Sequence, residues 1–177
     1  MQRTLALILC SLISLSFKTT CQAADFAWWV EWSMRPAGTD VEGVPVSALN
    51  RNWRHASVIR PSELPAAARQ QGERPEDNGA VFALDIDLDG DSHDERALVG
   101  VYETAQGQIG RFLLVLGRAS SEARWTKRAL FSLDDPKPFS AIRMVDGRLH
   151  WVGCFECDDD CTLVRSKSTF RLHCPTQ

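Results

Sequence analysis

The sequence has no apolar run long enough to form a permanent membrane anchor. The longest run, residues 5–17, is interrupted only by serines and is about 13 residues long, whereas a membrane-spanning helix needs about 20 residues. The sequence also lacks an excess of positive charge, because 23 Asp and Glu residues outnumber 20 Lys and Arg residues. We therefore expect no face that binds nucleic acid or anionic lipid through positive charge.

The short motifs that mark common enzyme classes are also missing. There is no Gly-x-Ser-x-Gly nucleophile elbow, no phosphate-binding glycine loop and no His-Glu-x-x-His zinc motif. The histidines have no evident catalytic partner in the sequence; they are His55, His93, His150 and His173. Paired carboxylates of a hydrolase can still meet only in the fold. A small secreted or periplasmic hydrolase is therefore the alternative to a non-enzymatic domain.

The start of the chain has the order of features that is typical of a secretory signal peptide. Arg3 precedes the apolar run, and a stretch of small residues follows it. We expect cleavage after Ala23, with cleavage after Ala24 as the alternative. The expected division is a signal peptide, residues 1–23, and one exported domain, residues 24–177, without a transmembrane segment. Export would place that domain in the periplasm or outside the cell.

The mature chain is long enough for one small domain. Removal of 23 residues from 177 leaves 154, a length that usually forms a single hydrophobic core. The loss of Arg3 and Lys18 changes the formal net charge from -3 to -5. We therefore expect an acidic, soluble, single-domain protein.

Four cysteines remain after cleavage, and an even number in an oxidising compartment favours disulfides. They are Cys154, Cys157, Cys161 and Cys174. A hairpin centred on residues 167–168 would place Cys161 opposite Cys174, so we favour that pair together with Cys154–Cys157. The pairing of Cys154 with Cys174 and of Cys157 with Cys161 is the alternative. A redox motif at Cys154 and Cys157, or a zinc site that adds His150 and Cys161, is less favoured in such a compartment.

The hydrophobic pattern predicts a mainly β domain, an antiparallel meander of about six to eight strands with one short helix. Apolar residues alternate over residues 26–34, which predicts a strand, and residues 66–71 before Gly72 read as the helix. Residues 36–60 show no sustained period. The further predicted strands are residues 80–86, 97–103, 109–116, 123–133, 139–145 and 148–153.

Two hairpins have a predictable register. The Asp146-Gly147 dipeptide suits a two-residue hairpin turn, because both positions tolerate positive φ. Centred there, the hairpin pairs Met144 with Leu149 and Ile142 with Trp151, and it places Arg143 and His150 on the opposite face. The hairpin that is centred on residues 167–168 pairs Leu163 with Leu172.

An acidic loop between two predicted strands carries the clearest chemistry. Residues 85–95 contain six carboxylates, and calcium binds six to eight oxygen ligands in a flexible loop of this kind. An EF-hand register that starts at Asp85 fails, because Arg96 occupies its twelfth position, where a glutamate should close the site. The second register starts at Asp87. Its expected metal ligands are Asp87, Asp89, Asp91, the backbone carbonyl of His93, and Glu95.

The segment from Asp87 to Glu95, followed by Ala97-Leu-Val-Gly, resembles the calcium loop of FG-GAP and VCBS repeats over about 20 residues. The resemblance implies a strand–loop–strand unit that holds calcium through the side chains of Asp87, Asp89, Asp91 and Glu95. Glutamate stands where the family usually has a closing aspartate. The chain has a single copy, whereas a propeller needs several, so we expect no propeller. An acidic turn without metal is the alternative.

The tryptophans allow two interpretations. Trp28, Trp29, Trp32 and Trp53 could stack on a carbohydrate, but burial in a core is commoner for such side chains, with Trp29 the one expected to be exposed. The sequence thus predicts a non-enzymatic, exported, calcium-binding β domain that acts as a binding or interaction module. Its partner would be a protein or a glycan.

Overall fold

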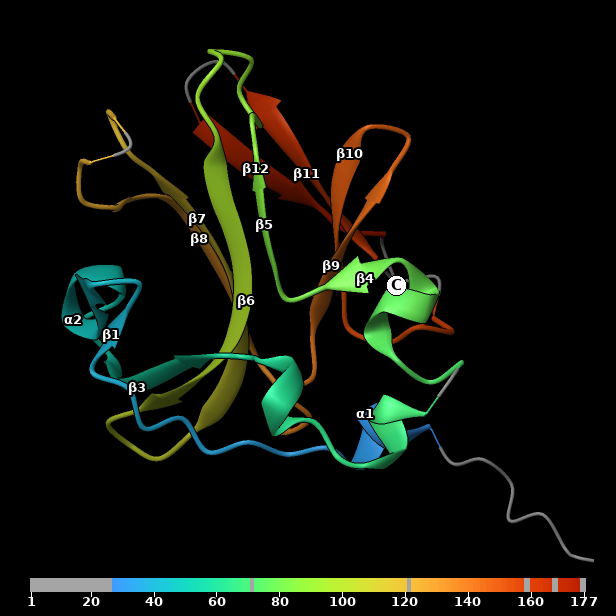
Figure 1. Cartoon of the computed structure of the whole chain (residues 1–177). Coiled ribbons are helices and arrows are strands. Elements are labelled where there is room, and N and C mark those ends of the chain that lie inside the picture. Colours follow the sequence, from blue (N-terminus) through green and yellow to red (C-terminus); the bar gives the residue numbers. More distant parts are fainter. Residues whose placement is uncertain (1–26, 71, 121, 158–159, 167–168, 176–177) are drawn as a thin grey trace, which may run out of the picture.

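The computed structural model describes residues 27–177 apart from 71, 121, 158–159, 167–168 and 176–177 (Figure 1). The predicted signal peptide therefore lies outside the described residues. The described chain is mainly β and forms one small domain with two five-stranded antiparallel sheets and a two-stranded one, which confirms the predicted fold class. In this part of the chain, no helix has the length and apolar character that crossing a membrane requires.

The first five-stranded sheet is built around one long central hairpin. Its strands are β3 (Trp53–Val58), β5 (Ala83–Ile86), β6 (Glu95–Thr104), β7 (Ile109–Gly117) and β8 (Thr126–Asp134). Strand β6 pairs with β7 along its length, while its other edge pairs with β5 near Glu95 and with β3 near Thr104. Two short strands thus share one long partner.

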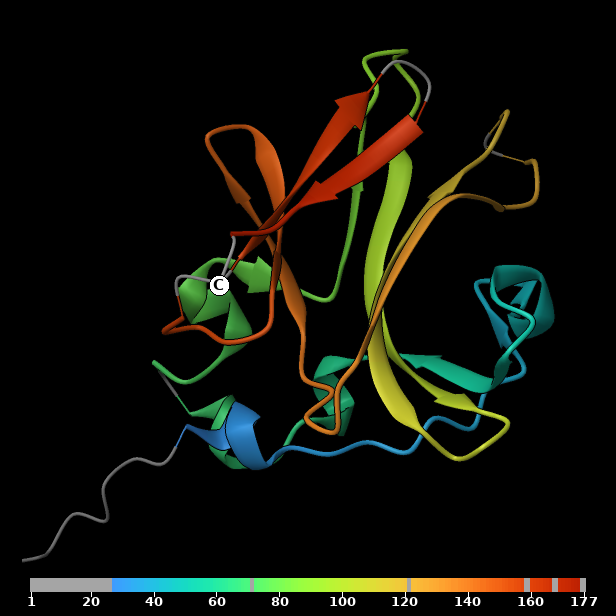
Figure 2. The ribbon, with the colours of Figure 1, turned by 180° about the vertical axis from the view of Figure 1, so that it is seen from behind.

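The second five-stranded sheet contains β4 and the last four strands. They are β4 (Ala80–Val81), β9 (Ala141–Val145), β10 (Arg148–Val152), β11 (Cys161–Ser166) and β12 (Thr169–His173), in the order β12-β11-β10-β9-β4. The chain passes from this sheet to the first between β4 and β5, and β12 lies against β8. The two sheets therefore face each other around a common interior (Figures 1 and 2).

The main core lies between the two sheets and includes Val99 and Leu113 from the first sheet and Ile142 and Trp151 from the second. A second cluster covers the outer face of the first sheet. It brings Leu98 and Leu114 against the segment with β1 (Asp40–Val41), β2 (Val44–Pro45) and α2 (Val46–Leu49). Because β6 and β7 are covered on both faces, they read as continuous apolar runs rather than as alternating ones.

The predicted hairpin registers are confirmed. Met144 lies opposite Leu149, Ile142 opposite Trp151, Arg143 opposite His150, and Leu163 opposite Leu172. Positive φ angles of 50° at Asp146 and 73° at Gly147 make the turn between β9 and β10, as a two-residue hairpin requires.

The strand that was predicted over residues 26–34 is wrong. Trp28–Glu31 form the short helix α1 instead. One helical turn buries Trp28, Trp29 and Trp32 together, and the ring centroid of Trp28 lies 5.1 Å from that of Phe139. A period of two would have left Trp29 on the outside, so aromatic packing decides the local structure.

Three further parts of the chain differ from the expectations. The predicted helix over residues 66–71 is reduced to a 3-10 turn, Ala67–Arg69, between two others at Pro61–Glu63 and Pro75–Asn78. The predicted strand over residues 80–86 is divided between the two sheets, because buried Phe82 separates β4 from β5. Residues 36–60, which had no predicted element, contain β1, β2, α2 and β3.

Candidate metal site at the acidic loop

The acidic loop connects β5 to β6 at one end of the molecule, which is the upper end in Figure 1. Ile86, the last residue of β5, pairs with Glu95, the first residue of β6. This register brings Asp87 back beside Glu95 across the hairpin. Positive φ angles at Gly90 and Ser92 let the chain turn sharply between Asp87 and Glu95.

Three carboxylates of the predicted ligand set converge in this loop. One oxygen from each of Asp87, Asp89 and Glu95 lies within 4.8 Å of the others. Asp89 and Glu95 are buried, with exposed fractions of 7% and 2%, although buried carboxylates are costly unless a cation or hydrogen bonds compensate them. Oxygens in this arrangement can bind one hard cation.

Asp87 organises the loop through backbone hydrogen bonds. Its carboxylate accepts the N–H groups of Gly90 at 2.6 Å, Ser92 at 2.9 Å and Asp91 at 3.2 Å. These bonds, with that from Ser92 the largest cause, lower the pKa of the Asp87 carboxyl. Asp87 is therefore ionised at neutral pH.

Glu95 has the opposite electrostatic environment. Its Oε2 accepts the Leu88 N–H at 2.9 Å, but burial, and then the charges of Asp89 and Asp91, raise the pKa of its carboxyl. The ionised form of Glu95 is thus disfavoured at this position. A bound cation would reverse that preference.

Arg128 on β8 contributes the positive charge that the sequence did not reveal. Its Nη2 lies 2.7 Å from Oδ2 of Asp89, and Asp89 Oδ1 also accepts the Asp91 N–H at 3.2 Å. Arg128 is 39 residues from Asp89 along the chain, and only the pairing of β6, β7 and β8 brings the two together. No local motif could have indicated it.

The other residues of the predicted ligand set lie outside this trio. Asp91 is exposed, and its Oδ1 accepts the His93 N–H at 2.9 Å and lies 3.3 Å from Nδ1 of His93. Asp85 is also directed elsewhere, because both of its oxygens accept hydrogen bonds from Arg96 at 2.7 Å. The first and twelfth positions of the rejected EF-hand register are therefore an ion pair with each other.

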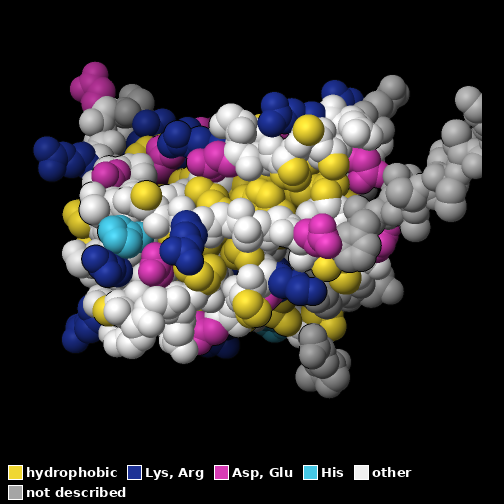
Figure 3. Space-filling model, turned by 90° about the horizontal axis from the view of Figure 1, so that it is seen from below, with side chains coloured by type: hydrophobic (Ala, Val, Ile, Leu, Met, Phe, Trp, Pro, Cys, Tyr) yellow, Lys and Arg dark blue, Asp and Glu magenta, His cyan; other side chains and the backbone are white. Residues whose placement is uncertain are grey.

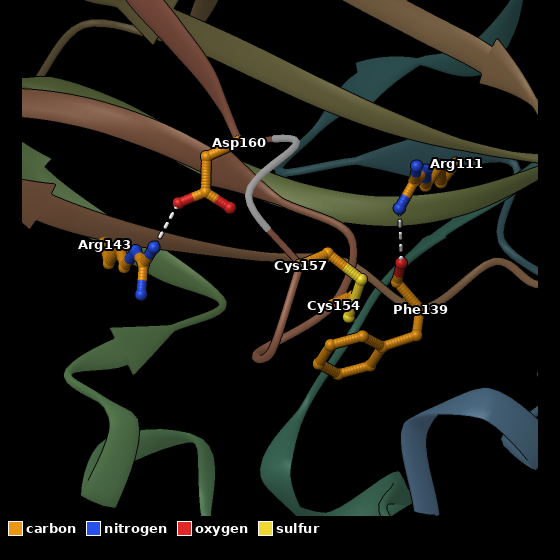
Figure 4. Close-up of a disulfide and its surroundings, with 6 residues drawn as sticks. All are labelled: Arg111, Phe139, Arg143, Cys154, Cys157 and Asp160. Carbon is orange, nitrogen blue, oxygen red and sulfur yellow. Dashed lines mark hydrogen bonds and ion pairs between the residues drawn. A yellow bond between two sulfur atoms is a disulfide. The ribbon is translucent and has the colours of Figure 1, made fainter. Parts of the chain in front are cut away.

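The four cysteines of the described residues form two disulfides, Cys154–Cys157 and Cys161–Cys174. The favoured pairing is confirmed, and the alternative pairing is wrong. Because the sulfur atoms of these four cysteines are bonded in pairs, they are not available as zinc ligands together with His150 in this state. Figure 4 shows the Cys154–Cys157 bridge above the ring of Phe139, whose carbonyl accepts a hydrogen bond from Arg111 at 3.0 Å.

The four tryptophans that could have stacked on a carbohydrate are buried in the hydrophobic cores. The prediction that Trp29 is exposed is wrong, because its exposed fraction is 7%. Trp53 stacks on Tyr102 with 4.2 Å between ring centroids. The edges of Trp28 and Trp32 line a shallow hollow of about 500 Å³ at the lower end of the molecule. Figure 3, which views that end, shows hydrophobic side chains in an interrupted band among scattered charges.

Comparisons of the chain with family models, with curated proteins and with solved structures found no match.

Proposed function

We propose that this protein is a non-enzymatic, exported β domain that binds calcium at residues 87–95 and acts as a binding or interaction module. The observation that carries the proposal is the convergence of Asp87 with two buried carboxylates, Asp89 and Glu95, at the start of a strand. The guanidinium group of Arg128 pairs with Asp89 of this cluster. Calcium would add further positive charge.

The proposed ligand set needs one local rearrangement. Asp87, Asp89 and Glu95 already converge, whereas Asp91 accepts a hydrogen bond from the backbone of His93. Both residues are exposed, so Asp91 can release this bond at little cost and turn toward the trio. The carbonyl of His93 then completes the protein oxygens, and water supplies the rest of the shell.

Export and a binding role have separate support. Two disulfides agree with folding in an oxidising compartment. Among the described residues, apolar side chains fill the space between the sheets; Leu113, Ile142 and Leu149 are each at most 1% exposed. A filled interior favours a surface that binds over one that performs chemistry.

The direct test is a thermal unfolding series with calcium and with a chelator. At a free calcium concentration of 100 times the Kd, linkage gives a stabilisation of about 2.7 kcal/mol, which raises the Tm of a domain of this size by about 5 to 10 °C. Extracellular modules bind calcium at about 0.1 to 1 mM, so the titration should reach millimolar concentrations. An unchanged Tm would leave the loop as an acidic turn.

The Glu95→Gln variant sharpens this test. Because the pKa of Glu95 is raised by burial and by neighbouring carboxylates, removal of its charge should increase stability in chelator and decrease the Tm shift that calcium produces. The matched control is Glu122→Gln, an exposed residue outside the loop, which should respond to calcium as the wild type does. Equal calcium responses of both variants would contradict the proposed site.

A further inference from the structure

A groove of about 350 Å³ lies at the same end of the molecule, between the acidic loop and the second sheet. On one side are the residues that follow β5, and on the other are the β9–β10 turn and strand β11. Figure 2 shows the β11–β12 hairpin (red) extending toward the acidic loop at this end. The volume lies within the range of small-molecule sites.

The floor of the groove is aliphatic. Leu149 and Leu163 are 1% and 6% exposed and belong to the main core, so the base of the groove is the filled edge of that core. Ile86 and Leu88 form the opposite wall. Met144, which pairs with Leu149 across the hairpin and is 37% exposed, extends the apolar surface on the same face.

The rim of the groove carries two guanidinium groups. Arg148 begins β10 and Arg165 lies near the end of β11, and both side chains are exposed. Arg165 reaches over the acidic loop, since its Nη1 would lie 3.8 Å from a Cβ placed on Gly90. Arginines that flank an aliphatic floor suit a carboxylate with an apolar tail, because a guanidinium presents two parallel donors to a carboxylate.

We propose that this groove binds a free aliphatic monocarboxylate, whose tail lies along the half-buried Ile86 and Leu88 and whose carboxylate is held by Arg148 and Arg165. The residues that line the groove include no aromatic ring, which disfavours a sugar as the occupant. The carboxylate of Asp87 also lines the groove. Its charge opposes an anion until calcium offsets it, so binding of the carboxylate is coupled to the calcium site and rests on the proposed function.

The test is calorimetric titration of the mature protein with octanoate, in excess calcium and in chelator. Octanoate should bind in calcium and bind more weakly in chelator. The Arg148→Gln and Arg165→Gln variants should each lose about tenfold in affinity, as expected for a charge-assisted hydrogen bond. Arg54→Gln, an exposed position on β3, is the matched control. Octylammonium, which has the same tail and the opposite charge, should not bind.

The outcomes separate the two proposals when Tm shifts are measured on the same samples. If calcium raises the Tm but octanoate binding does not depend on either arginine, the groove proposal is overturned and the calcium site stands. If octanoate binds equally well in calcium and in chelator, the coupling through Asp87 is overturned. If calcium leaves the Tm unchanged, the proposed function fails, whatever octanoate does.

Discussion

Tyr102 is the only tyrosine in the sequence, and it is buried in the cluster on the outer face of the first sheet. Its ring stacks on Trp53, and its hydroxyl donates a hydrogen bond to Asp134 at the end of β8. Burial, followed by the neighbouring Asp134 carboxylate, raises the pKa of this hydroxyl well above its usual value. The titration of the Tyr102 hydroxyl therefore shows whether the cluster on the outer face of the first sheet stays packed.

We predict that the tyrosinate absorbance of the native protein titrates well above pH 10, the midpoint of an unperturbed tyrosine being about 10. Because the folded pKa exceeds the unfolded one, this hydroxyl contributes its full stability below about pH 10, and the contribution is lost as the pH rises through the folded pKa. The free energy of unfolding should therefore decrease above pH 10. Tyr102→Phe should show a smaller alkaline loss, and a native midpoint at the ordinary value would contradict the burial of this group.

Gly153 is required because the Arg111 side chain packs directly against its backbone, not because its φ angle is positive. A Cβ on Gly153 would lie 1.9 Å from Nη1 of Arg111, and the Arg111 guanidinium is fixed by the Phe139 carbonyl and by the face of Trp151, 5.6 Å away. The absence of a side chain at residue 153 is what lets Arg111 occupy this position.

We expect Gly153→Ala to destabilise the fold by about 1 to 3 kcal/mol, the usual cost of overpacking, in denaturant unfolding. A double-mutant cycle supplies the control, because the clash disappears when Arg111 is truncated. In the Arg111→Ala background, Gly153→Ala should therefore cost little. Equal costs in both backgrounds would show that Arg111 is not the reason for the glycine.

Among the elements, β8 has a direct influence on the β5–β6 loop through Arg128. Arg128 pairs with a carboxylate of the proposed calcium site, and Asp89 is the more buried partner, with side-chain exposures of 38% for Arg128 and 8% for Asp89. The arginine therefore limits repulsion between the carboxylates of the loop, and at the proposed site it would compete with calcium for Asp89.

We predict that Arg128→Gln destabilises the calcium-free protein by about 1 to 3 kcal/mol, because a buried carboxylate loses its partner. The same variant should show a larger calcium-induced increase in Tm than the wild type. Arg124→Gln, an exposed position before β8, should leave both quantities unchanged. A calcium response that is equal to or smaller than that of the wild type would exclude competition between Arg128 and calcium.

Local elements were predictable from the sequence, whereas elements that depend on distant contacts were not. The β9–β10 register follows from one Asp-Gly turn, and the Cys161–Cys174 pair follows from a symmetrical hairpin. By contrast, α1 depends on contacts of its tryptophans with Phe139 and Phe155. Strand β3 was not predicted because buried and exposed residues do not alternate along it.

The candidate site, too, could be predicted from the sequence only in its local part. The alternate spacing of carboxylates pointed to Asp87, Asp89 and Glu95, since a tight loop between adjacent strands brings such positions together. Burial of Asp89 and Glu95, and the approach of Arg128, depend on the whole first sheet. The groove between the loop and the second sheet is likewise a product of how the sheets face each other.

At the scale of the whole molecule, the stabilisation by calcium should depend on pH. The pKa of Glu95 is raised in the fold, so without calcium its contribution to stability is present at low pH and is lost as the pH rises through the folded pKa. Calcium requires the ionised form. We therefore expect the difference in Tm between calcium and chelator to be small near about pH 4, the ordinary pKa of a glutamate, and to grow toward neutral pH. A difference that does not vary with pH would exclude Glu95 as a ligand.

Both disulfides are local cross-links, with sequence separations of 3 and 13 residues. One lies in the connection after β10 and the other joins the ends of the β11–β12 hairpin, so neither connects the second sheet to the first. Oxidation can therefore proceed on hairpins that have already found their register, before the two sheets meet. Although these four cysteines allow three pairings among themselves, the observed pairing needs no encounter between distant parts of the chain, and folding does not have to wait for disulfide exchange to correct it.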